Sequence, residues 1–276
     1  DDDFLTEIAG HLIAAGGKRV RPALTIAAAL SADGDPGAAP EDAVLGGVSV
    51  ELVHLGSLYH DDVMDDATTR RTVESVNARW GNLKAILAGD FLLARASEIA
   101  AGLGTEVAGL LAATIARLCE GQVRELKDAY VVGRTEDDYL RSIEGKTAAL
   151  FASSCRIGGI VAGFERDRIE ALTRFGRSYG MAFQVIDDVL DVVASSEELG
   201  KPAGHDLVEG VYTLPTLRTL QGPSGTELVD LLGRPLEPAE VDKALGLIRS
   251  DGAVTASLAD ARAYVDEGRS ALDELG

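Results

Sequence analysis

Cysteine, aromatic residues and long apolar runs are all scarce in this sequence. Two of the 276 residues are cysteines and 5% are aromatic. Cys119 and Cys155 each stand alone in an apolar, helix-like stretch, which favours two small buried residues over a disulfide or a metal site. This usage fits a reducing environment, and we expect a cytoplasmic protein. Since no uncharged apolar run approaches the roughly 18 residues that cross a bilayer, we expect no transmembrane segment.

Positive charge is also scarce. Lysine and arginine total 26 against 45 aspartates and glutamates, which gives a formal net charge of −19. A nucleic-acid partner is not expected, because phosphate backbones bind basic surfaces. An anionic small molecule can still bind where metal ions or clustered basic side chains neutralise it locally.

Proline is almost missing from the middle of the chain. None occurs between Pro40 and Pro202, and the intervening residues are rich in Ala, Leu, Glu and Arg, which favour helix. Alternating runs of β-branched residues, the signal of strands, do not stand out. In two segments apolar residues recur every three or four positions, as in a helix; they are Val44, Val48, Leu52, Leu55 and Tyr59, and Ile169, Leu172, Tyr179, Phe183, Ile186, Leu190 and Val193.

We therefore predict an all-α fold of about ten helices, forming a single domain over residues 1–276. Pro22 suits the first turn of a helix that follows the Gly16-Gly17 break. Residues 31–40, 195–210 and 222–225 are typical of loops. The chain from Ala239 onward is typical of two helices broken near Gly252.

Two clusters of aspartate, each at the end of a predicted long helix, carry the main functional signal. They are Asp61-Asp62-Val63-Met64-Asp65 and Asp187-Asp188-Val189-Leu190-Asp191. Residues three and four apart share a helix face, so Asp61 aligns with Asp65, and both Asp187 and Asp188 align with Asp191. Carboxylates stacked on one face repel one another unless a cation lies between them, and magnesium accepts carboxylate and phosphate oxygens.

A solvated acidic face is the plain alternative, since the whole chain is acidic. The repetition of the cluster, and the strongly apolar stretch before each copy, favour a metal site at the mouth of an apolar cavity. Neither cluster has the glycine-centred spacing and closing glutamate of an EF-hand calcium loop.

Basic and polar residues near these clusters favour a diphosphate ligand. Gly16-Gly17-Lys18-Arg19-Val20-Arg21-Pro22 places three cations beside a glycine turn at a helix start, which suits a phosphate cradle. Further candidates for binding this ligand are Arg70, Arg71, Lys146, Thr147, Lys201, His54 and Gln184. They have plainer alternative roles: the arginines could compensate nearby acids, the lysines could lie on the solvated surface, and the histidine could be a hydrogen-bonded core residue. Together they indicate a substrate with a diphosphate at one end and a hydrocarbon at the other.

At this point the sequence resembles the trans-isoprenyl (polyprenyl) diphosphate synthases. Five blocks match in order, namely GGKRVRP at 16–22, HDDVMD at 60–65 with RR at 70–71, GKT at 145–147, FQVIDDVLD at 183–191 and GKPAGHDL at 200–207. The resemblance implies an all-α isoprenoid synthase (prenyltransferase) fold around a central apolar cavity, usually as a homodimer. It also implies an alkyl-group transferase that joins isopentenyl diphosphate to an allylic diphosphate.

Site residues carry over from the resemblance position by position. Three magnesium ions per active site would be held by Asp61, Asp62, Asp65, Asp187, Asp188 and Asp191. The allylic diphosphate would be bound by Arg70, Lys146 and Lys201, with Thr147 and Gln184 nearby. Isopentenyl diphosphate would be held by Lys18, Arg21, His54 and Arg71. Asp61, Asp65, Arg70, Lys146, Asp187 and Lys201 would be the catalytic set.

The sequence departs from the usual family pattern at a few positions. Tyr59 stands where an aliphatic residue is common, and Thr72 where glycine commonly follows the arginine pair. Val211-Tyr212 replaces a lysine often found before Thr213 in short-chain members. In this family bulky aromatics one turn before the first cluster stop the product short. Gly56 and Ser57 are small there, so we predict a geranylgeranyl or longer polyprenyl product.

Two rival functions remain at this stage. A class I terpene cyclase also uses a DDxxD helix, but normally has a different second metal motif and no isopentenyl diphosphate cradle. A non-catalytic subunit of a heteromeric prenyl synthase usually loses its acidic clusters. Both clusters and the GGKRVRP block are present here, which favours a catalytic synthase.

Overall fold

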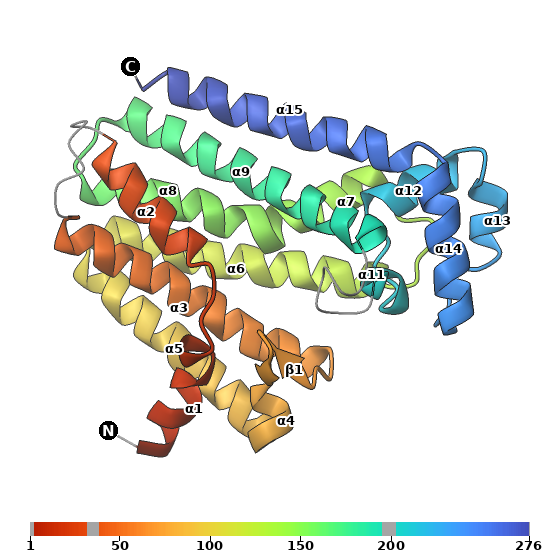
Figure 1. Ribbon diagram of the computed structural model, residues 1–276. Helices are drawn as coiled ribbons and strands as arrows, with labels where there is room; N and C mark the ends of the chain where they lie inside the picture. The colour runs from red at the N-terminus through yellow and green to blue at the C-terminus, as the bar shows by residue number, and fades with distance from the viewer. Residues whose placement is uncertain (1–2, 32–38, 195–202, 276) are drawn as a thin grey trace. The chain divides into compact units, whose positions relative to one another are not determined.

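The computed structural model describes residues 3–31, 39–194 and 203–275, and these residues are almost entirely helical (Figure 1). The one sheet among them is a hairpin of two-residue strands, β1 (Thr69–Arg70) and β2 (Val73–Glu74). The all-α prediction is thus confirmed. The described residues form more helices than the ten predicted, because short helices such as α4 (Val76–Trp80) and α13 (Gly225–Val229) carry too few residues for a periodic signal. In the part of the chain that is described, every helix is too short or too polar to cross a bilayer.

The chain divides into two compact units. The first comprises residues 1–115 and 153–173, and the second comprises residues 116–152 and 174–276. Three helices contribute residues to both, namely α6 (Thr105–Asp128), α8 (Ala149–Val161) and α9 (Arg166–Val193). The assignment of the whole chain to one domain stays a prediction.

The first unit is built around α3 (Glu41–Met64), which packs against α2 (Val20–Leu30) and α5 (Asn82–Gly102). Glycines allow the close approach. A Cβ at Gly47 would lie 3.1 Å from Pro22 Cα, and a Cβ at Gly56 would lie 3.0 Å from the Gly89 carbonyl oxygen. Pro22 falls in the first turn of α2, as predicted.

Helix α1 (Asp3–Ala14) is fastened to α3 by Tyr59. The Tyr59 ring is fully buried, and its hydroxyl oxygen lies 2.9 Å from the Ile8 carbonyl oxygen and accepts a 3.3 Å hydrogen bond from Leu12 N–H. A buried tyrosine needs such partners for its hydroxyl. The aromatic departure from the family pattern therefore has a structural explanation, because an aliphatic side chain would leave these backbone groups of α1 without this contact.

The second unit has its own core, formed where α9 meets the C-terminal helices. Met181, Val185, Leu207, Leu217 and Ile248 are among the side chains buried there. The helices that surround it, besides α13, are α7 (Glu136–Ile143), η1 (Glu144–Ala148), α11 (His205–Val208), α12 (Leu214–Gln221), α14 (Pro238–Ser250) and α15 (Ala253–Asp273).

The C-terminal predictions are mostly confirmed. The break near Gly252 separates α14 from α15, and Gly252 has a left-handed φ of 79°, which glycine adopts without strain. The loop predicted over residues 195–210 is wrong in part, because α11 lies within it. A four-residue helix is too short to give a periodic pattern.

Helix α9 confirms the helical periodicity of the second apolar stripe. The stripe is buried at its start, at Ile169 and Leu172, but its last four residues are 38–43% exposed, namely Phe183, Ile186, Leu190 and Val193. The buried face is the adjacent one, with Val185, Val189 and Val192, and it also carries Asp188 and Asp191. Periodicity identifies a helix but does not say which face meets the core.

Candidate active site

The first aspartate cluster lies at the C-terminal end of α3, and its three acids differ in exposure. Asp62 is fully buried, Asp61 is half-buried, and Asp65, which caps the helix, is exposed. The Arg70 guanidinium donates from Nε to Asp62 Oδ1 over 2.7 Å, and its Nη2 lies 2.6 Å from the same oxygen. Burial raises the pKa of Asp62, and the Arg70 charge and hydrogen bond partly offset this.

The other oxygen of Asp62, Oδ2, is also buried and has no hydrogen-bond partner among the residues that the structure describes. A buried carboxylate oxygen in this state is unfavourable unless a cation or water meets it. The acid is therefore held by Arg70 on one side and has coordinating capacity left on the other.

The β1–β2 hairpin brings Arg70 back to the cluster. Its register pairs Arg70 with Val73, so Arg71 and Thr72 form the two-residue turn. Both have positive φ, 52° and 66°, as a type I′ turn requires, although such turns favour Asn and Gly. Positive φ at a β-branched residue is strained by about 1–3 kcal/mol. This answers what Thr72 does in place of glycine: it adopts the glycine-like conformation.

The Arg71 side chain helps to hold this turn in place. Its Nη1 donates to the carbonyl oxygens of Leu12, over 3.2 Å, and Gly16. Gly17 has a φ of 134°, and a Cβ there would come within 2.8 Å of the Arg71 guanidinium. Glycine is therefore favoured at position 17 by both its backbone conformation and its lack of a side chain, and at position 16, with a φ of 87°, by its conformation alone.

His54 lies about two helical turns before the first cluster, and the charges of four arginines act on it. The pKa of His54 is well below its usual value, chiefly because of burial and further because of Arg21, Arg71, Arg70 and Arg19. His54 is thus a neutral imidazole among cations. Lys18 is exposed on the same glycine turn. Of the residues predicted to hold isopentenyl diphosphate, the structure brings together Arg21, His54 and Arg71.

Sequence reasoning included Arg19 only as one of the three cations of the glycine-turn block, and it missed Glu51. Glu51 is only 9% exposed, forms an ion pair with Arg19, and lies 4.0 Å from Arg71 Nη2. Arg19 also donates to the Ile13 carbonyl oxygen over 2.8 Å. Glu51 lies three residues before His54, so helical phase was the available signal that both side chains share a face.

The second cluster has the same spacing but the opposite kind of support. Asp188 and Asp191 are buried, with 4% and 3% of their surface exposed, while Asp187 is exposed. Tyr139 Oη donates to Asp188 Oδ2 over 2.5 Å, and Gln184 Nε2 donates to Oδ1 over 2.8 Å. Both donors are uncharged. Burial raises the pKa of Asp188 to about 7, against the opposing effect of these two hydrogen bonds.

Asp191 links the cluster to the chain beyond it. Its Oδ2 accepts a 3.1 Å hydrogen bond from the backbone N–H of Asp206 in the first turn of α11, and its carbonyl oxygen accepts one from Gly204 N–H. A carboxylate at a helix N-terminus is stabilised by the helix dipole. Lys201, a predicted ligand of the allylic diphosphate, lies outside the described residues.

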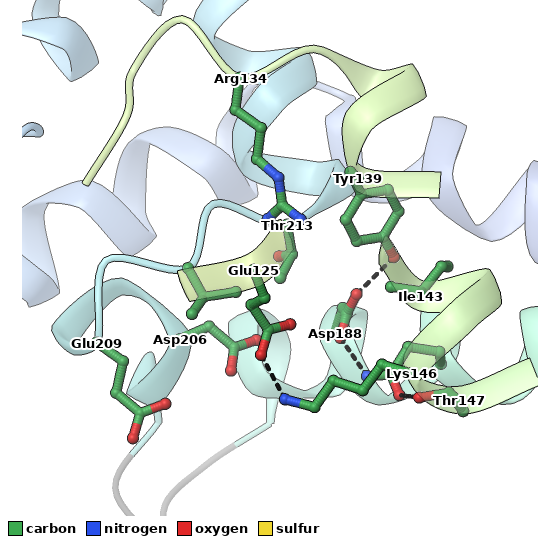
Figure 2. A pocket seen from close by; sticks show the side chains of 12 residues that line it. Glu125, Arg134, Tyr139, Ile143, Lys146, Thr147, Asp188, Asp206, Glu209 and Thr213 are labelled. Carbon is green, nitrogen blue, oxygen red and sulfur yellow. Dashed lines mark hydrogen bonds and ion pairs between the residues drawn. The ribbon is translucent and has the colours of Figure 1, made fainter. Parts of the chain in front are cut away.

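A pocket of about 110 Å³ opens beside Asp188 (Figure 2). Thr147 Oγ1 donates to Gln184 Oε1 over 2.7 Å, and this fixes which end of the Gln184 amide faces Asp188. Lys146 forms an ion pair with Glu125. The lining residues are Glu125, Arg134, Tyr139, Ile143, Lys146, Thr147, Gln184, Asp188, Asp206, Glu209, Val211 and Thr213.

Lys146 and Thr147 lie in a π-helical turn, η1. Such turns are rare and often mark functional sites. The turn packs tightly on α6, where a Cβ at Gly121 would come within 2.4 Å of Lys146 N. The sequence predicted a helix here but gave no sign of the wider turn.

Gly56 and Ser57, the small residues one turn before the first cluster, face different parts of the molecule. A Cβ at Gly56 would point at the α5 backbone near Gly89. Ser57 is half-buried, and its hydroxyl donates to the His54 carbonyl oxygen over 2.8 Å. Ser57 lies three residues after His54 and four before Asp61, so it shares their face of α3.

The donor set fits magnesium. Both clusters offer only carboxylate oxygens, which hard cations prefer, and Asp62 Oδ2 is a buried oxygen without a hydrogen-bond partner in the described chain. Within the described ranges, three or more acidic, histidine or cysteine side chains do not converge into a ready-made metal cage. Magnesium characteristically uses one or two carboxylates and completes its shell with water and phosphate oxygens.

Known proteins are similar to this chain in sequence and fold. The profile of the family described as Polyprenyl synthetase matches residues 2–248. Nonaprenyl diphosphate synthase of Mycobacterium tuberculosis is 42% identical over 90% of this chain and 74% of its own length. Heptaprenyl diphosphate synthase of Staphylococcus aureus superposes with a TM-score of 0.92 at 32% identity, over 99% of this chain and 86% of that one.

A further solved structure carries ligands. Geranylgeranyl pyrophosphate synthase of Corynebacterium glutamicum, complexed with calcium and isoprenyl diphosphate, is 40% identical. It superposes with a TM-score of 0.84 over 99% of this chain and 83% of its own.

Proposed function

The chain belongs to the polyprenyl synthetase family, and on that premise we propose that it condenses isopentenyl diphosphate with an allylic diphosphate to give a geranylgeranyl or longer polyprenyl diphosphate. The observation that carries this proposal is the pair of acidic clusters, each with its own basic or polar partners. Relatives that are 42% and 37% identical to this chain are a nonaprenyl and a geranylgeranyl diphosphate synthase. A role as a non-catalytic subunit is not favoured.

Electrostatics supports the first step, ionisation of the allylic carbon–oxygen bond. The carboxylates of the two clusters would hold magnesium, which supplies charge stabilisation to the departing pyrophosphate. They are Asp61, Asp62, Asp65, Asp187, Asp188 and Asp191. Lys146, with Thr147 and Gln184 beside it, would bind the same diphosphate. Arg70 and Lys201, which the family resemblance also assigns to the allylic diphosphate, would bind it together with Lys146.

The second substrate would bind beside His54, near the middle of α3, where arginines from neighbouring segments act on the imidazole. Arg21, Arg71 and Lys18 supply charge to a diphosphate, and the neutral His54 supplies a hydrogen bond without adding charge. Isopentenyl diphosphate held there would present its double bond to the allylic cation, and a proton would then be lost to the released pyrophosphate. Positioning and exclusion of water are the protein's part in this step.

One incubation tests the reaction. The protein is mixed with magnesium, isopentenyl diphosphate and a set of allylic primers of increasing length, and the products are measured by mass. We expect stepwise elongation, and an Asp187→Asn control with strongly reduced turnover. No elongation with any primer would sink the proposal, and a cyclic hydrocarbon formed without isopentenyl diphosphate would favour the cyclase.

Product length is tested at Ser57. Ser57→Phe should shorten the products, since Ser57 shares a helix face with Asp61, and Ser57→Ala is the matched control. Gly56→Phe should instead disturb α3–α5 packing, because its Cβ already meets the Gly89 carbonyl. If Ser57→Phe leaves the product distribution unchanged, the growing product does not pass this residue.

We further propose a cytoplasmic homodimer that uses α5. This helix exposes Leu83, Ile86 and Leu87 at 72%, 40% and 55%, a row of large apolar side chains on one helix face. Such patches mark interaction surfaces. Leu83→Glu with Leu87→Glu should convert a dimer to a monomer in light scattering after size exclusion. A monomeric wild-type protein would contradict the proposal.

A further inference from the structure

Arg134 is a buried cation in the connection between α6 and α7. Its side chain is 1% exposed, and its Nη1 donates to the Tyr212 carbonyl oxygen over 3.1 Å. Its Nε lies 3.5 Å from Asp128 Oδ2, beyond ordinary hydrogen-bond length. Its Nη2 is buried without a hydrogen-bond partner in the part of the chain that the structure describes. A charge removed from water in this way is costly unless it serves the charges around it.

The guanidinium faces the pocket beside the second cluster. It lies over the Tyr139 ring, with 5.6 Å from Cζ to the ring centroid, within the range of a cation–π contact. Tyr139 in turn donates its hydroxyl to Asp188. Figure 2 shows the Arg134 side chain reaching into the pocket beside the Tyr139 ring. Arg134 therefore contacts the second cluster through one aromatic side chain.

The charges of the pocket explain why a cation is needed here. Four carboxylates line it, with only two cations; they are Glu125, Asp188, Asp206 and Glu209, against Lys146 and Arg134. Lys146 is already paired with Glu125. Without Arg134 the pocket would oppose any anionic ligand more strongly, because charge effects are large where water is excluded.

We propose that Arg134 is a positioning residue for the second aspartate cluster: it holds Tyr139 against Asp188 and offsets the acids of the pocket, so that the pocket accepts a magnesium-bound diphosphate. This inference rests on the proposed function and adds a residue to it. Arg134 acts through Tyr139 and through its charge.

The first test removes the charge at nearly constant length. Arg134→Met should weaken binding of inorganic pyrophosphate, measured by calorimetry at saturating magnesium, by about tenfold. The KM for the allylic diphosphate should rise by a similar factor, while the KM for isopentenyl diphosphate should change less than about twofold. Arg134→Lys keeps the charge and should lose less than about threefold.

The second test supplies the charge from another residue. Val211 lines the same pocket and adjoins Tyr212. Val211→Lys in the Arg134→Met background should recover most of the lost pyrophosphate affinity, and Val211→Met in the same background should recover none. A purely structural Arg134, needed only for its bond to the Tyr212 carbonyl, predicts no recovery with either.

Val211→Lys in the wild-type background keeps the idea testable if Arg134→Met does not fold. The added cation should raise pyrophosphate affinity by about threefold over Val211→Met. Equal affinities for these two variants, or a folded Arg134→Met that binds pyrophosphate like the wild type, would overturn the role of Arg134. Wild-type protein that elongates no primer would overturn the proposed function instead, so the two failures are distinguishable.

Discussion

The two aspartate clusters have the same spacing and opposite surroundings. In each, the second acid of the motif is buried, Asp62 in the first and Asp188 in the second, and in the second cluster Asp191 is buried as well. Asp62 is paired directly with the Arg70 guanidinium. Asp188 is held by a tyrosine hydroxyl and a glutamine amide, and the Arg134 guanidinium lies over the ring of that tyrosine.

This difference separates two ways of keeping a carboxylate inside a protein. A contact ion pair compensates charge with charge, whereas neutral donors compensate it with dipoles alone. Accordingly the pKa of Asp188 rises to about 7 because of burial. In the first cluster the negative charge of Asp62 is therefore compensated by the positive charge of Arg70. In the second cluster the negative charge of Asp188 has only neutral donors, so a bound cation would have to compensate it.

The largest expected effect tests whether the clusters are equal in catalysis despite this difference. Asp61→Asn and Asp187→Asn should each lower kcat by about 10³-fold, since each removes an accessible carboxylate that would hold magnesium. Neither should lower the melting temperature of the metal-free protein, because each removes one of several neighbouring like charges. The measurement is steady-state turnover beside a thermal melt.

Unequal losses would break the comparison in a useful way. If one variant kept more than about a tenth of wild-type turnover, a difference of over a hundredfold from the other, the two clusters would not contribute equally to catalysis. The matched control is Asp66→Asn, which alters an exposed acid just outside the first cluster and should leave turnover unchanged.

These surroundings mark the limit of what the sequence could predict. Helical phase placed both clusters at helix ends, because phase is a local property of the chain. It did not predict which acids are buried, since Asp188 and Asp191 are buried and Asp187 is exposed. Arg70 reaches Asp62 from eight residues away, through a hairpin whose two-residue turn contains no glycine. Tyr139 reaches Asp188 across 49 residues, and no local pattern encodes such a pairing.

The fold shows the same division between local and distant information. Long periodic helices such as α3 and α14 were predicted, and so was the break at Gly252. The π-helical turn at Lys146 was not, because it depends on the close approach of Gly121 from another helix. Propensity and period describe one segment at a time, whereas tertiary packing selects the rarer local geometry.

The next largest effect concerns the ion pair of the first cluster. Arg70→Met should lower the free energy of unfolding by about 3 kcal/mol, the lower end of the range for breaking a buried pair, because Arg70 is one-third exposed. Urea denaturation of the metal-free protein measures this. Asp62→Asn combined with Arg70→Met should restore at least half of the loss, since it removes the uncompensated acid. A loss below about 1 kcal/mol would mean that the pair behaves like an exposed one.

The pH dependence of stability should separate the two buried acids. The folded-state pKa of Asp188, about 7, lies above its usual value of 3.8, so the folded chain binds more protons than the unfolded chain between these values. Its contribution therefore stabilises at low pH and is lost as pH rises toward 7, with a slope of at most about 1.4 kcal/mol per pH unit.

Asp188→Asn should remove this slope, so its stability relative to wild type should increase steadily from pH 5 to pH 7 in metal-free buffer. The net charge of the chain also changes with pH, and Asp62→Asn is the matched control for that. Because Arg70 offsets the burial of Asp62, this control should change the slope less. Parallel curves for Asp188→Asn and wild type would show that Asp188 stays ionised over this range.

The smallest effect tests the neutral support of the second cluster by itself. Tyr139→Phe removes one hydroxyl from a buried site and leaves the ring under Arg134, so packing and the cation–π contact persist. The lost hydrogen bond to a carboxylate should lower stability by about 1–2 kcal/mol at pH 8, where Asp188 is ionised. At pH 5, where Asp188 is protonated, the loss should be smaller, because the acid then no longer depends on an outside donor. A loss that is equal at both pH values would assign Tyr139 to packing rather than to the charge of Asp188. In that case the contrast between a charge-balanced and a dipole-balanced cluster would rest on Gln184 alone.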